Sequence, residues 1–199
     1  MYDVRHNYWL ADDARVYDSQ RQIITTTADD HYVAWLEHFN VPTPWPRDLA
    51  GDQTNKSLQD VLHPHDLFVD LIYYIGFVRK KTIQGDIIVN GLRFSTDPLT
   101  LGSLNSAYIY TVSNNGAVFS WKLPDGSFIT LNKADVDALQ TIANTFAQDC
   151  FKCEDTTLDG IEAGTITTRE QVDAAFAAVP NSFTGLTEDA QKVRHKRTA

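Results

Sequence analysis

The chain has 199 residues, of which 43% are hydrophobic and 11% aromatic, as in an ordinary soluble globular protein. Its net charge of −9 disfavours general binding to nucleic acid or to an anionic membrane surface, so we expect neither as a partner. No apolar run approaches the roughly 20 residues needed to span a bilayer, and the first residues lack the pattern of a secretory signal, which predicts a start in a cytoplasm.

Residues 1–46 are predicted to form an N-terminal arm, a β-hairpin followed by a helix. Short strands are expected at residues 7–10, 16–17 and 22–25. Thr27 or Asp29 can cap the helix, whose apolar face is formed at helical spacing by Tyr32, Trp35, Leu36 and Phe39. Asn40 suits the end of this helix. Residues 47–60 show no clear periodicity and are predicted to be a linker.

A main domain is predicted over residues 61–180. A helix that starts near Pro64 or Asp66 opens it, and a hairpin follows over residues 86–95, around the turn dipeptide Asn90-Gly91. The next helix is expected to begin after Thr96-Asp97-Pro98 and to end at Asn114-Asn115-Gly116. The rival interpretation is a strand over residues 107–112, where tyrosine and β-branched residues cluster.

The second half of this domain opens with a hairpin that leads directly into a capped helix. Residues 120–131 are two strand-like runs joined by Pro124-Asp125-Gly126, and Asn132 is the predicted N-cap, with Asp135 in the first turn. The apolar face of this helix continues to Cys150. Two short helices are expected after it, over residues 157–163 and after the capping box at Thr168.

The predicted fold class is therefore α+β, with a hairpin-helix arm and a domain of short hairpins packed among several helices. Residues 181–199 are predicted to be a basic C-terminal tail. The last eight residues, Lys192–Ala199, contain four Lys or Arg and no acid, which favours a solvated tail; docking on an acidic surface is the alternative.

Few residue clusters indicate chemistry. Cys150 and Cys153 are the only cysteines, and they lie at the end of a helical pattern, where the helix dipole opposes a thiolate, so packing is favoured over redox catalysis. His63, His65 and Asp66 could be imagined as metal ligands, but nothing nearby completes a set. We therefore predict no metal, no cofactor and no catalytic residues. A thiol-redox or hydrolytic enzyme is the remaining alternative.

Two parts of the sequence resemble a known family. In the arm these are Asn7-Tyr-Trp-Leu10, Val16-Tyr-Asp-Ser19, Asp30-His-Tyr-Val-Ala-Trp-Leu36 and Asn40-Val-Pro-Thr-Pro44. This set resembles the N-terminal arm of many tailed-phage and prophage proteins that are encoded beside tail-fibre genes. Residues from about Leu67 to Phe176 resemble the uncharacterised domain that often follows that arm. Its matching points are Arg79, the segment 91–97, Trp121 before Asp125-Gly126, the helix from Leu131 to Phe146, Phe151 and Ile161.

The resemblance implies a tail-fibre-associated role, either as a structural or adaptor subunit of the virion tail or as a transient tail-fibre assembly chaperone. The implied partners are tail-fibre or other tail or baseplate proteins, with a homo-oligomer as a further possibility. The implied location is the virion tail, and the host cytoplasm during assembly. The family brings no catalytic residues.

The predicted partner-binding residues are aromatic residues of the arm, namely Tyr8, Trp9, Trp35 and Trp45. They are expected to be exposed, because the arm has little core of its own, and exposed aromatic residues suit docking onto another chain. The alternative is that Trp35 packs within the arm and Trp45 only covers the linker. On either interpretation, replacing Trp45 is expected to leave folding intact.

Overall fold

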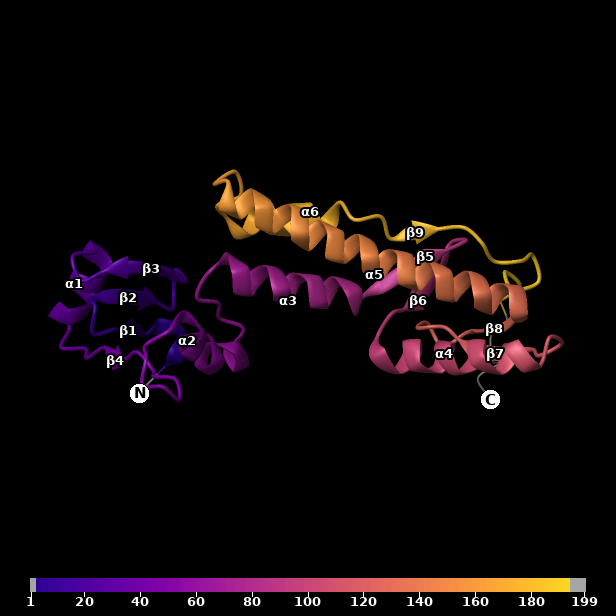
Figure 1. Cartoon of the computed structure of the whole chain (residues 1–199), viewed down its shortest axis with the longest axis horizontal. Coiled ribbons are helices and arrows are strands. Elements are labelled where there is room, and N and C mark those ends of the chain that lie inside the picture. The colour runs from indigo at the N-terminus through magenta and orange to yellow at the C-terminus, as the bar shows by residue number, and fades with distance from the viewer. Residues whose placement is uncertain (1–2, 194–199) are drawn as a thin grey trace. The chain divides into compact units, whose positions relative to one another are not determined.

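The computed structural model describes residues 3–193 (Figure 1). It divides into two compact units, Met1–Ile75 and Gly76–Ala199, and the division falls inside helix α3 (Leu71–Ile83). Each unit combines short strands with helices, so the predicted α+β class is confirmed.

The N-terminal unit contains a small sheet with the strand order β3-β2-β1-β4. Its strands are β1 (Tyr8–Leu10), β2 (Arg15–Asp18), β3 (Ile23–Thr26) and β4 (Thr43–Pro44). The predicted hairpin is confirmed, because β1 pairs antiparallel with β2, and β2 antiparallel with β3. The sequence did not indicate β4, which pairs parallel with β1.

Helices cover both faces of this sheet. On one face, α1 (Asp30–Glu37) brings Tyr32 and Trp35 against Tyr8 of β1. On the other face, α2 (Asn55–Leu62) packs on the side chains of Trp9 and Tyr17, which lie opposite each other in the β1–β2 pair. This second cluster is the larger core of the unit and consists of Trp9, Ala11, Tyr17, Trp45, Leu58, Leu62, Leu67 and Val69.

The prediction of a linker over residues 47–60 is wrong. Thr54 caps α2 by accepting a hydrogen bond from the Ser57 N–H, and Leu58 and Leu62 of that helix are fully buried. Their spacing of four residues is a helical signal, but it is short and surrounded by polar residues. The first unit therefore extends to Ile75 rather than ending at residue 46.

The helix predicted from Pro64 or Asp66 begins later than expected. Residues His63–His65 form a 3₁₀ turn, and Asp66 ends it at a positive φ of +56°, which breaks the helical path. Leu67, Phe68 and Val69 are buried in an irregular segment before α3 starts at Leu71.

In the C-terminal unit, both predicted hairpins are confirmed. The first joins β5 (Asp86–Val89) to β6 (Leu92–Ser95) through Asn90 and Gly91, which both have the positive φ that a tight primed turn needs. The second joins β7 (Phe119–Lys122) to β8 (Phe128–Leu131). A short strand from near the C-terminus, β9 (Ser182–Phe183), pairs parallel with β5.

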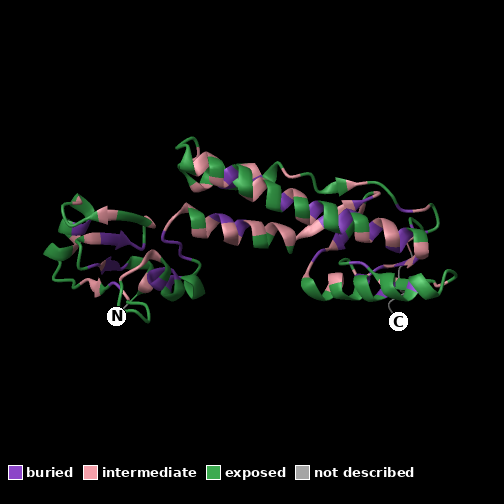
Figure 2. Ribbon diagram, viewed as in Figure 1, coloured by how far each residue is buried: buried purple, intermediate pink, exposed green. Residues whose placement is uncertain are grey.

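Helix α5 (Lys133–Glu162) organises this unit (Figures 1 and 2). The predicted cap is confirmed as a full capping box, in which Asn132 accepts from the Asp135 N–H and Asp135 accepts from the Asn132 N–H. The buried core along it includes Leu131, Val136, Leu139, Ile142, Ala143, Phe146 and Cys150.

The separate helix predicted over residues 157–163 is wrong, because α5 continues through these residues as one helix of 30 residues. Gly164, at a φ of +70°, then ends it as predicted. The helix after the Thr168 capping box is confirmed as α6 (Arg169–Ala177). The choice of helix over strand at residues 107–112 is also confirmed, since they lie within α4 (Pro98–Ser113), capped by Asp97.

The first part of the predicted C-terminal tail is folded. Beyond β9, Leu186 and Ala190 are buried in the core of the unit, and the Thr187 N–H donates to the Asp135 carboxylate at 2.8 Å. The prediction of a tail starting at residue 181 is therefore wrong up to at least residue 190. Most of its basic residues, at positions 194–199, lie outside the described residues.

Candidate functional site

The predicted aromatic anchors belong to the core of the N-terminal unit. Trp45 is only 1% exposed, its indole N–H donates to the Thr54 carbonyl at 2.8 Å, and the Arg15 guanidinium lies 4.8 Å from its ring centroid. Trp9 is also buried, and its indole N–H donates to the Ser19 hydroxyl at 3.1 Å. The prediction that these residues are exposed is wrong, because a four-stranded sheet and α2 enclose them.

Tyr8 and Trp35 form an aromatic cluster with Tyr32 under α1. The centroid of the Tyr8 ring lies 5.2 Å from the centroid of the Tyr32 ring and 5.0 Å from that of the Trp35 ring, and both distances are typical of packed aromatic pairs. Tyr8 is buried and Trp35 is half-buried. Of the alternatives, packing of Trp35 within the arm is the one that the structure supports.

Four of the exposed apolar residues of the N-terminal unit lie along α1 and just after it. This surface, which we call the α1 rim, consists of Val33, Leu36, Phe39 and Val41. Phe39 is 95% exposed and Val41 is 81% exposed. Sequence reasoning assigned Phe39 to the buried face of the helix, which is wrong because α1 ends before it.

Phe39 has an unusual backbone conformation for an aromatic residue. Its φ is +59°, in the left-handed region, where the residue that follows a helix is usually glycine or asparagine. Its N–H donates to the Leu36 carbonyl at 2.9 Å, and the Asn40 side-chain amide donates to the Trp35 carbonyl at 2.9 Å. Phe39 thus takes the left-handed position after the helix that the sequence predicted for Asn40. This conformation costs free energy for a phenylalanine, and the ring is not buried.

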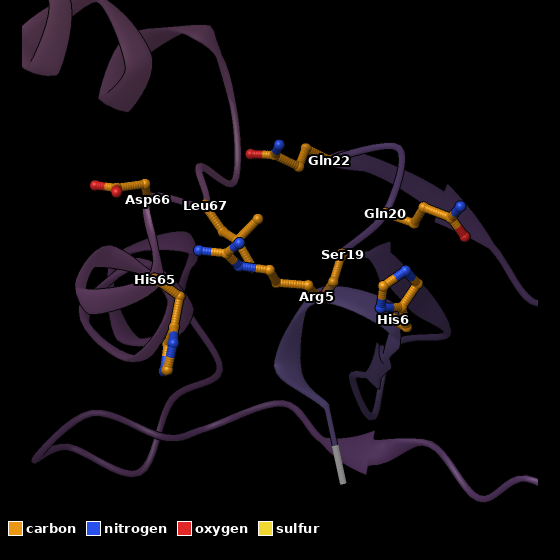
Figure 3. Close-up of a pocket in the computed structure, with 8 residues that line it drawn as sticks. All are labelled: Arg5, His6, Ser19, Gln20, Gln22, His65, Asp66 and Leu67. Carbon is orange, nitrogen blue, oxygen red and sulfur yellow. The ribbon is translucent and has the colours of Figure 1, made fainter.

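An open groove of about 410 Å³ also lies in the N-terminal unit (Figure 3). It is lined by Arg5, His6, Ser19, Gln20, Gln22, His65, Asp66 and Leu67. Three of its polar side chains already serve the fold: Gln22 accepts from the Phe68 N–H, Ser19 accepts from Trp9, and His6 contacts Asp3 at 2.8 Å. Within residues 3–193 no group of three or more His, Cys, Asp or Glu could hold a metal ion, so His63, His65 and Asp66 do not form one.

The two cysteines are free thiols in α5. Cys150 is fully buried, and burial raises the pKa of its thiol to about 11. Burial also raises the pKa of Cys153, which is half-buried and lies beside an apolar groove of about 470 Å³ between α5 and α6. Both thiols are therefore kept protonated, the opposite of what thiolate chemistry requires.

A second exposed apolar surface lies on α4 in the C-terminal unit. No residue between Asp97 and Lys122 is charged, although 22% of the chain is. Leu104, Ala107 and Thr111 form the buried side of α4. Its outward side, which we call the α4 face, presents the apolar residues Leu99, Ile109, Tyr110 and Val112, the small residues Gly102, Ser103, Ser106 and Ser113, and one amide, Asn105.

The comparisons with known proteins place the C-terminal unit in a family. The family model described as Domain of unknown function (DUF4376) matches residues 73–178, more than half of the chain. The chain belongs to the DUF4376 family. No curated protein and no solved structure matches it. The α4 face lies inside the DUF4376 domain and the α1 rim lies outside it. None of the helices in residues 3–193 has the length and apolar character to cross a membrane.

Proposed function

We propose that the chain is a non-enzymatic, tail-fibre-associated structural or adaptor subunit of a bacteriophage tail. Its partner is a tail-fibre or other tail or baseplate protein, and it is located in the virion tail after assembly in the host cytoplasm. The proposal rests first on the resemblance of residues 7–44 and 67–176 to phage proteins encoded beside tail-fibre genes. The DUF4376 match, at residues 73–178, covers almost the same second stretch and carries no function of its own.

The observation that carries the docking role is Phe39. The ring is 95% exposed, so only a partner can remove it from solvent. The positive φ of Phe39 costs conformational free energy, and no packing of the ring within the unit offsets that cost. Aromatic anchors buried at the centre of an interface typically contribute about 2 kcal/mol or more. The α1 rim thus replaces the buried tryptophans as the proposed docking surface of the arm.

Two carboxylates and both cysteines of the chain are engaged in the fold, which favours a non-enzymatic role. Asp29 caps α1 and accepts from Arg21 at 2.6 Å, Asp13 pairs with Arg15 at 2.7 Å, and both cysteines have raised pKa values. A double variant, Cys150→Ser with Cys153→Ser, tests the redox alternative. Loss of phage infectivity with unchanged stability would favour an enzyme.

Mass spectrometry of purified particles tests the proposal. We expect the chain at a fixed stoichiometric copy number in wild-type particles, and we expect Phe39→Asn to lower its incorporation while the protein stays folded. The matched control is Leu49→Asn, which removes another fully exposed apolar side chain of the same unit away from the rim.

Absence from particles, together with co-purification with unassembled fibre, would instead indicate the transient assembly chaperone. Incorporation of Phe39→Asn at the wild-type level would remove the α1 rim as the docking surface. No association with particles or fibre in either assay would overturn the phage-tail proposal.

A further inference from the structure

The α4 face combines exposure with a complete lack of charge. Leu99, Ile109 and Val112 are 81%, 61% and 67% exposed, and Tyr110 beside them is also exposed. Figure 2 shows exposed residues along most of this helix. The exposed side of a helix in a globular protein normally carries charged residues, and the exposed side of α4 carries none.

Two serine hydroxyls of the α4 face are satisfied within the helix itself. The Ser103 hydroxyl donates to the Leu99 carbonyl at 3.0 Å, and the Ser106 hydroxyl donates to the Gly102 carbonyl at 2.9 Å. These hydroxyls can therefore be covered without being left unpaired.

Nothing in residues 3–193 explains why position 102 is a glycine. Glycine within a helix costs roughly 0.5–1 kcal/mol relative to alanine. A Cβ added at Gly102 would meet nothing within 4 Å, and its backbone is ordinary helix, so neither packing nor conformation requires glycine here. A small residue on an exposed face, next to Ser103 and Ser106, allows the backbone of a second helix to approach closely.

We infer that the α4 face joins two copies of this chain. Each copy carries a net charge of −9, so copies repel one another over most of their surface, and a face without charge can be placed against its own copy without that repulsion. A two-fold interface uses the same patch on both subunits, and an uncharged patch meets no like charge there. The face has no Lys or Arg to attract nucleic acid or anionic lipid.

The β7 end of the second hairpin extends this surface beyond α4. The ring centroids of Tyr110 and Phe119 lie 6.1 Å apart, and Val118 beside Phe119 is exposed. A helix of this length is about 24 Å long, which alone gives a narrow contact. The added hairpin residues help the contact approach the roughly 1,000 Å² of total buried surface that specific interfaces need.

Sedimentation equilibrium of the full chain, at low and high micromolar concentration, tests this inference. We expect the wild-type mass to rise with concentration to twice the 22.4 kDa of the chain. Ile109→Glu should weaken dimerisation by about 100-fold or more, because each interface would then bury two unpaired carboxylates. Leu49→Glu, a change of the same type at a fully exposed position in the N-terminal unit, should leave the dimer unchanged.

Circular dichroism and thermal melting show whether each variant is folded, and Val112→Lys provides a second test if Ile109→Glu unfolds. A wild-type mass of 22.4 kDa at every concentration would overturn the inference, as would a folded Ile109→Glu that dimerises like the wild type. Flotation of a monomeric wild type with neutral phosphatidylcholine vesicles would overturn it in favour of a lipid surface. This mass measurement is independent of particle incorporation, so it can fail while the proposed tail function stands.

Discussion

Replacing Phe39 with asparagine is expected to stabilise the N-terminal unit. The left-handed conformation costs a residue other than glycine about 1–2 kcal/mol, and asparagine tolerates it better because its short side chain can hydrogen-bond locally. The ring is 95% exposed, so its removal sacrifices little packing. The free energy of unfolding should therefore rise by about 0.5–1 kcal/mol, against the usual direction of point mutations.

Tryptophan fluorescence is suited to this measurement because Trp9, Trp35 and Trp45 lie in the N-terminal unit, leaving only Trp121 in the other. In urea unfolding followed by this signal, a gain of that size raises the midpoint by roughly 0.3–0.7 M for a slope of about 1.5 kcal/mol/M. The slope itself should not change, since the same surface is exposed on unfolding.

Val41→Asn is the matched control for Phe39→Asn. It also exchanges an exposed apolar side chain for an amide after α1, but Val41 is not among the residues with positive φ, so its midpoint should stay close to that of the wild type. A midpoint for Phe39→Asn that is lower than that of the wild type would refute the reasoning, because it would mean that the ring stabilises the unit by packing.

Three further outcomes are expected. Trp45→Ala should destabilise the N-terminal unit by about 3–5 kcal/mol in urea unfolding followed by circular dichroism, because it empties a buried site, contrary to the expectation from sequence. Cys150 should resist a thiol reagent at pH 8 in the native chain and react in denaturant, since its pKa is about 11; rapid native reaction would contradict this. A hydrogen bond from Arg21 lowers the pKa of Asp29 to about 2, so its stabilising contribution is present above about pH 4 and lost as the pH falls towards 2. The melting temperature of Asp29→Asn should therefore depend less on pH over that range.

The sequence predicted elements whose cause is local. The Asn90-Gly91 turn, the Asn132 cap and the Thr168 capping box each depend on residues a few positions apart, and each is found in the structure. The Asp97 cap and the stop at Asn114-Asn115-Gly116 likewise led to the correct choice of helix for residues 107–112, although the β-branched residues there favour strands.

The prediction that Trp45 is exposed failed because its burial depends on contacts between distant residues. Trp45 is buried because β4 pairs with β1 and because α2 packs on the same side of the sheet, and neither contact has a short-range signal. Residues 47–60 are predicted to be a linker because they show no clear periodicity, since the only apolar pair of α2 that is buried, Leu58 and Leu62, is surrounded by polar residues.

Some residues of this chain are unfavourable for the local backbone conformation in which they lie, and only some of these are explained by contacts within the chain. Gly160 lies within α5, and a Cβ there would come within 2.8 Å of the Ile166 side chain, so the chain returning from Gly164 explains the glycine. At Gly102 and Phe39 no such internal reason exists in the described residues, since one faces open space and the other exposes its ring. Natural sequences are locally consistent except where function imposes a cost. Gly102 and Phe39 lie on separate units, and each belongs to an exposed apolar surface. The simplest physical account is that another molecule packs against each of these surfaces.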